Sequence, residues 1–211
     1  MQRSKIALTL LMTTALGIGL AGCGAATATP PPNAAPRQSE IAAPSAEPTK
    51  TLPATNTNGN LEKAIGEDGA VVFAGGEENA FTFKVTNIEV NPDCTGDGSF
   101  KVPSKNGEFV ALTFEITTSA DYLKVMSGGE PLRLFWQDWK GYSATGTVVE
   151  NGPNGLTCFA RDESMPLDIP AGTTSTGKFV LDLDPSAASV GWSPSYVRGQ
   201  DKSGWEWAIP Q

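Results

Sequence analysis

The stretch Glu108-Phe109-Val110-Ala111-Leu112-Thr113-Phe114-Glu115-Ile116 decides the fold of this 211-residue chain. Its large apolar side chains recur at every second position, at Val110, Leu112, Phe114 and Ile116. Successive side chains of a β-strand point to opposite faces, so a period of two predicts a strand with one buried face. The sequence in this region therefore predicts a central strand, not a helix.

The same period continues toward the amino terminus. Phe81, Phe83 and Val85 alternate with polar residues, and then the apolar positions change phase to Ile88 and Val90. A one-residue change of phase within a strand is typical of a β-bulge, which we expect near Thr86-Asn87.

Further alternating runs follow toward the carboxyl terminus, separated by Gly-, Pro-, Asn- and Asp-rich breaks. We expect strands at residues 132–136, 142–149, 179–183, 190–192 and 205–209, with a turn at 138–141. Short strands with frequent turns predict an all-β fold, an antiparallel immunoglobulin-like β-sandwich of about seven to nine strands. Residues 61–211 would form it as one domain.

Several of these stretches resemble a known family. They are Phe83–Val90, Gly107–Ile116, Ile169–Gly172 with Gly177–Asp182, and Asp138-x-x-Gly141 as a hairpin. The chain resembles the immunoglobulin-like domain of unknown function of actinobacterial lipoproteins, whose fold is similar to that of a secreted mycobacterial immunoprotective antigen. The resemblance implies a fold and a location but no activity. The long connection from Glu150 to Ser164 has no counterpart in that pattern.

The first 22 residues predict a lipoprotein signal peptide. Arg3 and Lys5 precede an apolar run that ends in Leu20-Ala21-Gly22-Cys23. A basic start, an apolar centre and small residues before the cut are typical of a signal peptide, and the run is short for a transmembrane helix. We expect diacylglycerol on Cys23 to anchor the mature protein to the membrane, at the extracellular face. An ordinary secretory signal is the alternative.

Residues 23–60 predict a disordered linker after the lipidated cysteine. Residues 24–60 contain seven of the sixteen prolines and no aromatic residue. Such a segment buries too little apolar surface to offset the entropy lost on ordering. We expect it to hold the domain away from the membrane, and its Thr and Pro content is compatible with glycosylation.

The charge balance argues against a nucleic-acid partner. Removing residues 1–22 takes away two basic residues and no acidic one, which leaves 13 basic against 23 acidic residues and a net charge of −10. A phosphate backbone would repel such a surface. We expect a protein or glycan partner that the sequence does not identify.

Cys94 and Cys158 predict a disulfide. With Cys23 acylated they remain as an even pair, and an oxidising compartment favours their pairing. Closing a loop of this length stabilises the folded state by about 4 kcal/mol through the entropy of the unfolded chain. Two free buried thiols are the alternative.

Two groups of residues are candidates for binding. Asp93 and Asp97 stand in a glycine-containing loop and supply oxygens of the kind that calcium prefers, but the spacing does not match an EF-hand and a solvated loop is the simpler interpretation. Of the five tryptophans, we expect Trp136, Trp192 and Trp207 to fill the core. Trp139, in the predicted turn, would be the exposed one and a candidate contact for a sugar or a protein.

Catalysis is not expected. The chain has no histidine and no Gly-x-Ser-x-Gly motif, so the commonest general base and a common nucleophile arrangement are missing. Asp162 with Glu163 and Asp182 with Asp184 are nominal carboxylate pairs, and the second pair lies on the polar face of one strand, where solvation explains it. We predict a non-enzymatic binding or interaction role at the cell surface without a cofactor or metal, and as the alternative an envelope binder of a small molecule, glycan or cation such as calcium.

Overall fold

The computed structural model describes residues 54–96, 102–197 and 204–211. The expected signal peptide, Cys23, Asp97 and most of the expected linker lie outside the described residues. The described part of the chain is built of short and long β-strands with brief 3-10 turns. No helix within it is long and apolar enough to cross a membrane.

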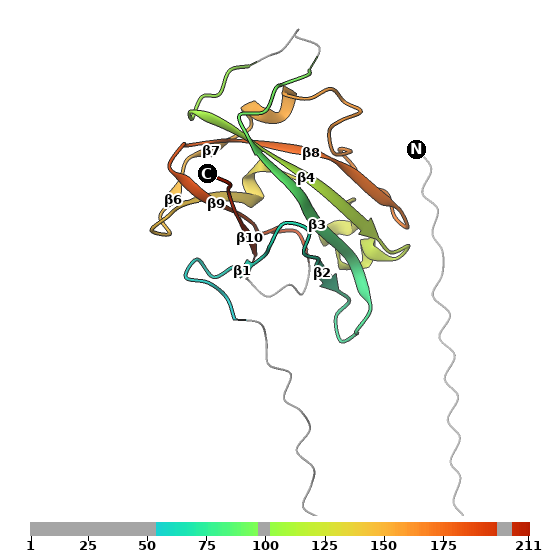
Figure 1. Cartoon of the computed structure of the whole chain (residues 1–211). Coiled ribbons are helices and arrows are strands. Elements are labelled where there is room, and N and C mark those ends of the chain that lie inside the picture. The colour runs from blue at the N-terminus through green and yellow to red at the C-terminus, as the bar shows by residue number, and fades with distance from the viewer. Residues whose placement is uncertain (1–53, 97–101, 198–203) are drawn as a thin grey trace, which may run out of the picture. The chain divides into compact units, whose positions relative to one another are not determined.

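The strands form two five-stranded sheets (Figure 1). One, the tryptophan sheet, has the order β1 (Leu61–Glu62), β10 (Trp205–Ala208), β9 (Ala187–Trp192), β5 (Trp139–Ser143) and β6 (Val148–Val149). The other, the long-strand sheet, has the order β2 (Gly69–Val72), β3 (Asn79–Val90), β4 (Glu108–Thr118), β8 (Thr174–Leu183) and β7 (Asn151–Gly152). All pairings between these strands are antiparallel except that of β1 with β10.

Aromatic side chains fill the space between the two sheets. Phe83 of β3 packs edge-on against Trp205, with ring centroids 4.6 Å apart. Phe114 of β4 packs edge-on against Trp139 at 5.6 Å. The four alternating apolar residues of β4, from Val110 to Ile116, are fully buried. The all-β sandwich fold predicted from the period of two is confirmed.

The predicted bulge in β3 is also confirmed. The pairing of β3 with β4 changes register between Val85 and Asn87. Phe83 and Val85 before this point and Ile88 after it are all buried. The extra residue therefore returns the apolar side chains to the inner face of the sheet.

The region between β4 and β6 differs from the prediction. Residues 132–136 form no strand; Leu132 makes an isolated bridge with Ile169, and Trp136 begins a 3-10 turn, η3 (Trp136–Asp138). The expected turn and hairpin at 138–141 are wrong, because β5 begins at Trp139 and turns at residues 144–147. Gly141 is needed for close packing, since a Cβ there would lie 2.7 Å from a methyl group of Val149.

The three remaining 3-10 turns lie in connections. They are η1 (Tyr122–Val125), η2 (Ser127–Gly129) and η4 (Asn154–Thr157). The last of them belongs to the chain between β7 and β8, which shapes the candidate site.

Candidate functional site: a groove beside β8

Residues 153–168, the connecting segment, cover part of the outer face of the long-strand sheet. A disulfide joins Cys158 of this segment to Cys94, with the two Cα atoms 4.5 Å apart, which confirms the predicted pairing. Cys158 and Phe159 pack against Ala111 and Val180, in a small apolar cluster separate from the main core. These side chains point away from the tryptophan sheet, since side chains on β4 and β8 alternate between faces.

Three glycines allow the connecting segment to lie close to its neighbours. A Cβ on Gly155 would be 2.5 Å from a methyl group of Val180, and one on Gly177 would be 2.5 Å from the backbone nitrogen of Met165. A Cβ on Gly96 would be 2.5 Å from the carbonyl oxygen of Thr157. No side chain fits at these distances, so the sequence positions the segment with glycine at each crossing.

Backbone and charged contacts tie the segment to β8. The backbone N–H of Lys178 donates to the carbonyl of Glu163 at 2.8 Å, and that of Met165 donates to the carbonyl of Lys178 at 2.9 Å. The Lys178 ammonium lies 3.9 Å from the centre of the Phe159 ring and 4.0 Å from a carboxylate oxygen of Glu163. Lys178 therefore belongs to the structure that holds the segment in place.

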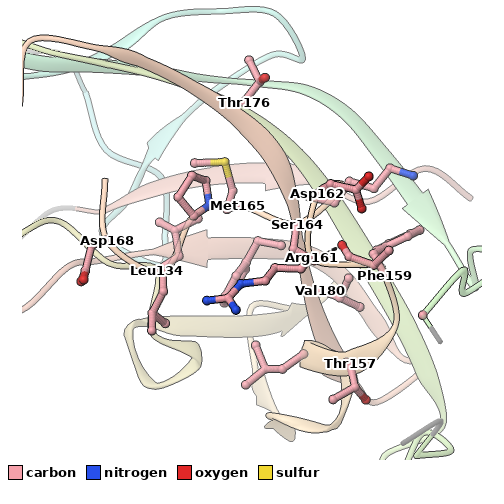
Figure 2. A pocket seen from close by; sticks show the side chains of 18 residues that line it. Leu134, Thr157, Phe159, Arg161, Asp162, Ser164, Met165, Asp168, Thr176 and Val180 are labelled. Atoms are coloured by element: carbon pink, nitrogen blue, oxygen red, sulfur yellow. Dashed lines mark hydrogen bonds between the residues drawn. The ribbon is translucent and has the colours of Figure 1, made fainter. Parts of the chain in front are cut away.

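A cavity of about 1030 Å³, the groove, lies between this segment and β8 and opens to solvent (Figure 2). Its size is just above the range of about 300–1,000 Å³ that is typical of small-molecule sites. The lining is mixed. Its apolar side chains include Leu134, Leu156, Phe159, Met165, Leu167 and Phe179, and its charged side chains are Arg161, Asp162, Asp168 and Lys178.

Arg161 is the cation that the groove leaves available. Its side chain reaches into the cavity from the connecting segment (Figure 2). Within the described residues it makes no ion pair, whereas Asp168 is paired with Arg133 outside the groove. Asp162 and Asp168 lie on opposite sides of Arg161 in Figure 2.

The placement of Trp139 is a correction. It was expected to be exposed, but it is 1% exposed in the core. Its ring stacks on Trp192 with the planes 15° apart. Because residue 139 begins a strand, its side chain points inward. Trp192 and Trp207 are buried as expected, and Trp136 is partly buried against the same core.

The acidic candidates are distributed differently from the prediction. Asp93 is exposed, and Asp97 lies outside the described residues. The described part of the chain contains no cluster of three Asp, Glu, His or Cys residues that could hold a metal ion. The calcium hypothesis therefore receives no geometric support from these residues.

The expectation that Asp182 is solvated is wrong. It is fully buried on the outer face of β8. Its carboxylate accepts hydrogen bonds from the Ser104 hydroxyl at 2.6 Å and from the backbone N–H groups of Lys105 and Asn106 at 2.9 and 3.0 Å. These hydrogen bonds fix the loop before β4, so a structural role accounts for the buried carboxylate of Asp182.

A second buried acid, Glu206, was missed by the sequence analysis. It lies on the outer face of the tryptophan sheet and accepts from the side chains of Asn58 at 2.9 Å, Asn60 at 2.8 Å and Ser189 at 2.6 Å. Burial raises the pKa of Glu206, but these hydrogen bonds outweigh burial and hold the pKa below its ordinary value.

Residues 56–60, the asparagine loop, therefore belong to the folded domain, which begins before the expected boundary at residue 61. The backbone N–H groups of Asn58 and Asn60 both donate to the side-chain oxygen of Asn56 at 3.0 Å. Asn-rich composition is typical of linkers, and the one signal that argues otherwise is the spacing of three asparagines at every second position.

Comparison with models of known protein families finds no match, and comparison with curated proteins finds none either. Among solved structures, the chain is similar to MPT63, a secreted protein of Mycobacterium tuberculosis. The two share 16% identity with a TM-score of 0.43, over 71% of this chain and 97% of that one.

Proposed function

We propose that this chain is a lipoprotein, anchored at the extracellular face of the cell membrane through Cys23, whose sandwich domain binds a small molecule in the groove without catalysing a reaction. The observation that carries the binding role is the groove itself. The sequence leaves open whether the partner is a protein or a small molecule. A concave site of this size favours a small molecule, because protein interfaces are usually flatter.

The disulfide supports the location. Cys94 and Cys158 are bonded, and such bonds persist in oxidising compartments outside the cytosol. Together with the lipobox ending in Cys23, this favours export followed by lipidation. The resemblance to actinobacterial lipoproteins agrees with the same proposal.

The anchor is tested by growing cells with an alkyne-tagged fatty acid. The wild-type protein is expected to carry the tag and to fractionate with membranes, and Cys23→Ala to lose both. Ser45→Ala is the matched control, because it changes one residue of the same expected linker and leaves both Cys23 and the disulfide in place. A Cys23→Ala protein that is still tagged would contradict the proposal.

The binding site is tested by extracting the protein purified from its own cells and identifying released small molecules by mass spectrometry. Thr176→Trp fills the groove from β8 and is expected to abolish a molecule released by the wild type. Thr82→Trp, on β3 of the same sheet and outside the lining, is the control and should release it normally. Equal release from both variants would contradict binding in the groove.

A further inference from the structure

Resting on the groove as the binding site, we infer that its ligand is an amphipathic anion, with an apolar body and one carboxylate or phosphate group that pairs with Arg161. Two properties of the lining support this inference: its exposed apolar side chains and its charge pairing.

The groove holds apolar side chains that face solvent. Leu167 is 73% exposed and Leu156 is 52% exposed, and both line the same cavity. Single exposed leucines are common on protein surfaces, but two in one hollow provide an apolar contact surface. Met165 and Leu134 continue it toward the core, against which both pack. The body of a ligand in this cavity is therefore apolar.

The charges in the groove leave one cation for a ligand. Lys178 is already engaged by the Phe159 ring and Glu163, and Asp168 by Arg133. Arg161 reaches into the cavity without an ion pair among the described residues. A guanidinium presents two parallel N–H donors, which match the oxygens of a carboxylate or phosphate.

A cationic or neutral ligand fits less well. A cation in the middle of the groove would be repelled by Arg161. Asp162, the lining acid without an ion pair among the described residues, is exposed and lies to one side of Arg161 (Figure 2). A neutral apolar molecule would cover the guanidinium without replacing the water bound to it. An anion next to an apolar body satisfies both parts of the surface.

The experiment is a calorimetric titration of the mature chain, purified from its own cells and placed in phosphatidylcholine nanodiscs. The probes are octanoate, octyl phosphate, 1-octanol and octyltrimethylammonium, and empty nanodiscs provide the blank. The wild type is expected to bind the two anions about tenfold or more tightly than octanol, as a charge-assisted hydrogen bond allows.

Three variants locate the effect. Arg161→Gln is expected to remove the preference for anions and to leave octanol binding unchanged. Leu167→Ser should weaken the anions and octanol alike, because it acts on the apolar wall. Lys140→Gln, exposed on β5 of the other sheet, removes a positive charge elsewhere and should change neither.

The outcomes separate the two proposals. Equal binding of octanol and octanoate, weakened by Leu167→Ser, would overturn the anion but leave the groove as a binding site. An anion preference that survives Arg161→Gln would likewise overturn the inference. Failure of every probe to bind would overturn both.

The source of the anion is separated by repeating the titration in phosphatidylglycerol nanodiscs. If lipid phosphates occupy the groove, octyl phosphate binding should weaken in phosphatidylglycerol nanodiscs for the wild type and for Lys140→Gln alike, because both have an intact groove, and Arg161→Gln should show no such loss. If the natural ligand is a soluble anion, the lipids do not compete for the groove, and octyl phosphate should bind with the same affinity in both kinds of nanodisc.

Discussion

Each sheet of the sandwich has a segment packed on its outer face, and the two segments are held in different ways. The connecting segment on the long-strand sheet is held by one disulfide, three close glycine crossings and an apolar cluster. The asparagine loop on the tryptophan sheet is held by hydrogen bonds to one buried carboxylate, Glu206. The connecting segment is therefore fixed at a few separate points, and the groove lies between it and β8.

The asparagine loop follows the opposite rule. Hydrogen bonds are short and directional, so each bonded residue must lie within about 3 Å of its partner. Asn56, Asn58 and Asn60 are all bonded, and the loop follows the sheet closely. The two segments should therefore be disrupted by different conditions. Reduction of the disulfide should loosen the connecting segment, and acid should loosen the asparagine loop.

Breaking the disulfide is the largest of the expected effects. Replacing Cys94 and Cys158 together by Ser is expected to lower the free energy of unfolding by about 2–4 kcal/mol, because the unfolded chain regains the entropy of an open loop. Urea denaturation measures it. Amide exchange at Phe159 and Lys178 should rise much more than at Leu112 in the core. Unchanged stability after reduction would contradict this account of the connecting segment.

Removing one asparagine should have the next largest effect. Asn60→Ala takes a donor from buried Glu206 and an acceptor from the N–H of Gly204, and is expected to cost about 1.5–3 kcal/mol. Asn87→Ala, exposed on β3, is the matched control and should change stability by less than about 0.5 kcal/mol. Similar values for the two variants in urea denaturation would show that the asparagine loop is not held through Glu206.

A methyl group at a glycine crossing tests the fit of the connecting segment. Gly155→Ala is expected to cost about 1–3 kcal/mol, because its Cβ would overlap Val180. Gly76→Ala is the control, since its nearest neighbour would be 3.6 Å away. Adding Val180→Ala to Gly155→Ala should recover part of the loss, and strictly additive costs would rule out a direct clash.

The smallest effect is the pH dependence of the asparagine loop. The folded-state pKa of Glu206 lies below 4.5, so the unfolded chain binds more protons than the folded chain in the window below 4.5. The stabilisation is fully present above that pH and is lost as pH falls through the lowered pKa. Glu206→Gln should reduce this slope in urea denaturation series from pH 5 to pH 3. An unchanged slope would contradict the role of the carboxylate.

Much of the sandwich is predictable from the sequence because burial between two sheets imposes a period of two. The β4 strand and the bulge near Asn87 follow from apolar spacing alone. Trp139 was placed wrongly because Asp-x-x-Gly is typical of a turn, whereas Gly141 serves close packing inside a strand. The spacing of apolar residues indicates which residues are buried. It does not distinguish a glycine in a turn from a glycine that allows close packing inside a strand.

The candidate site was less predictable than the fold. The disulfide followed from counting cysteines, but the groove depends on where the connecting segment passes over β8. Arg161 and Leu167 look like ordinary surface residues in the sequence, and only their common cavity relates them. Glu206 has a similar explanation, since the asparagines that surround it lie about 146 positions earlier in the chain.

The parallel pairing of β1 with β10 has a mechanical consequence. Any tension arriving along the chain from its amino-terminal side reaches the domain at the asparagine loop and then at the two paired positions of β1. Both attachments can detach while β10 stays paired with β9, and the tryptophan core remains intact. The asparagine loop and β1 are thus the first parts of the domain to yield under load, and their detachment leaves β10 paired with β9.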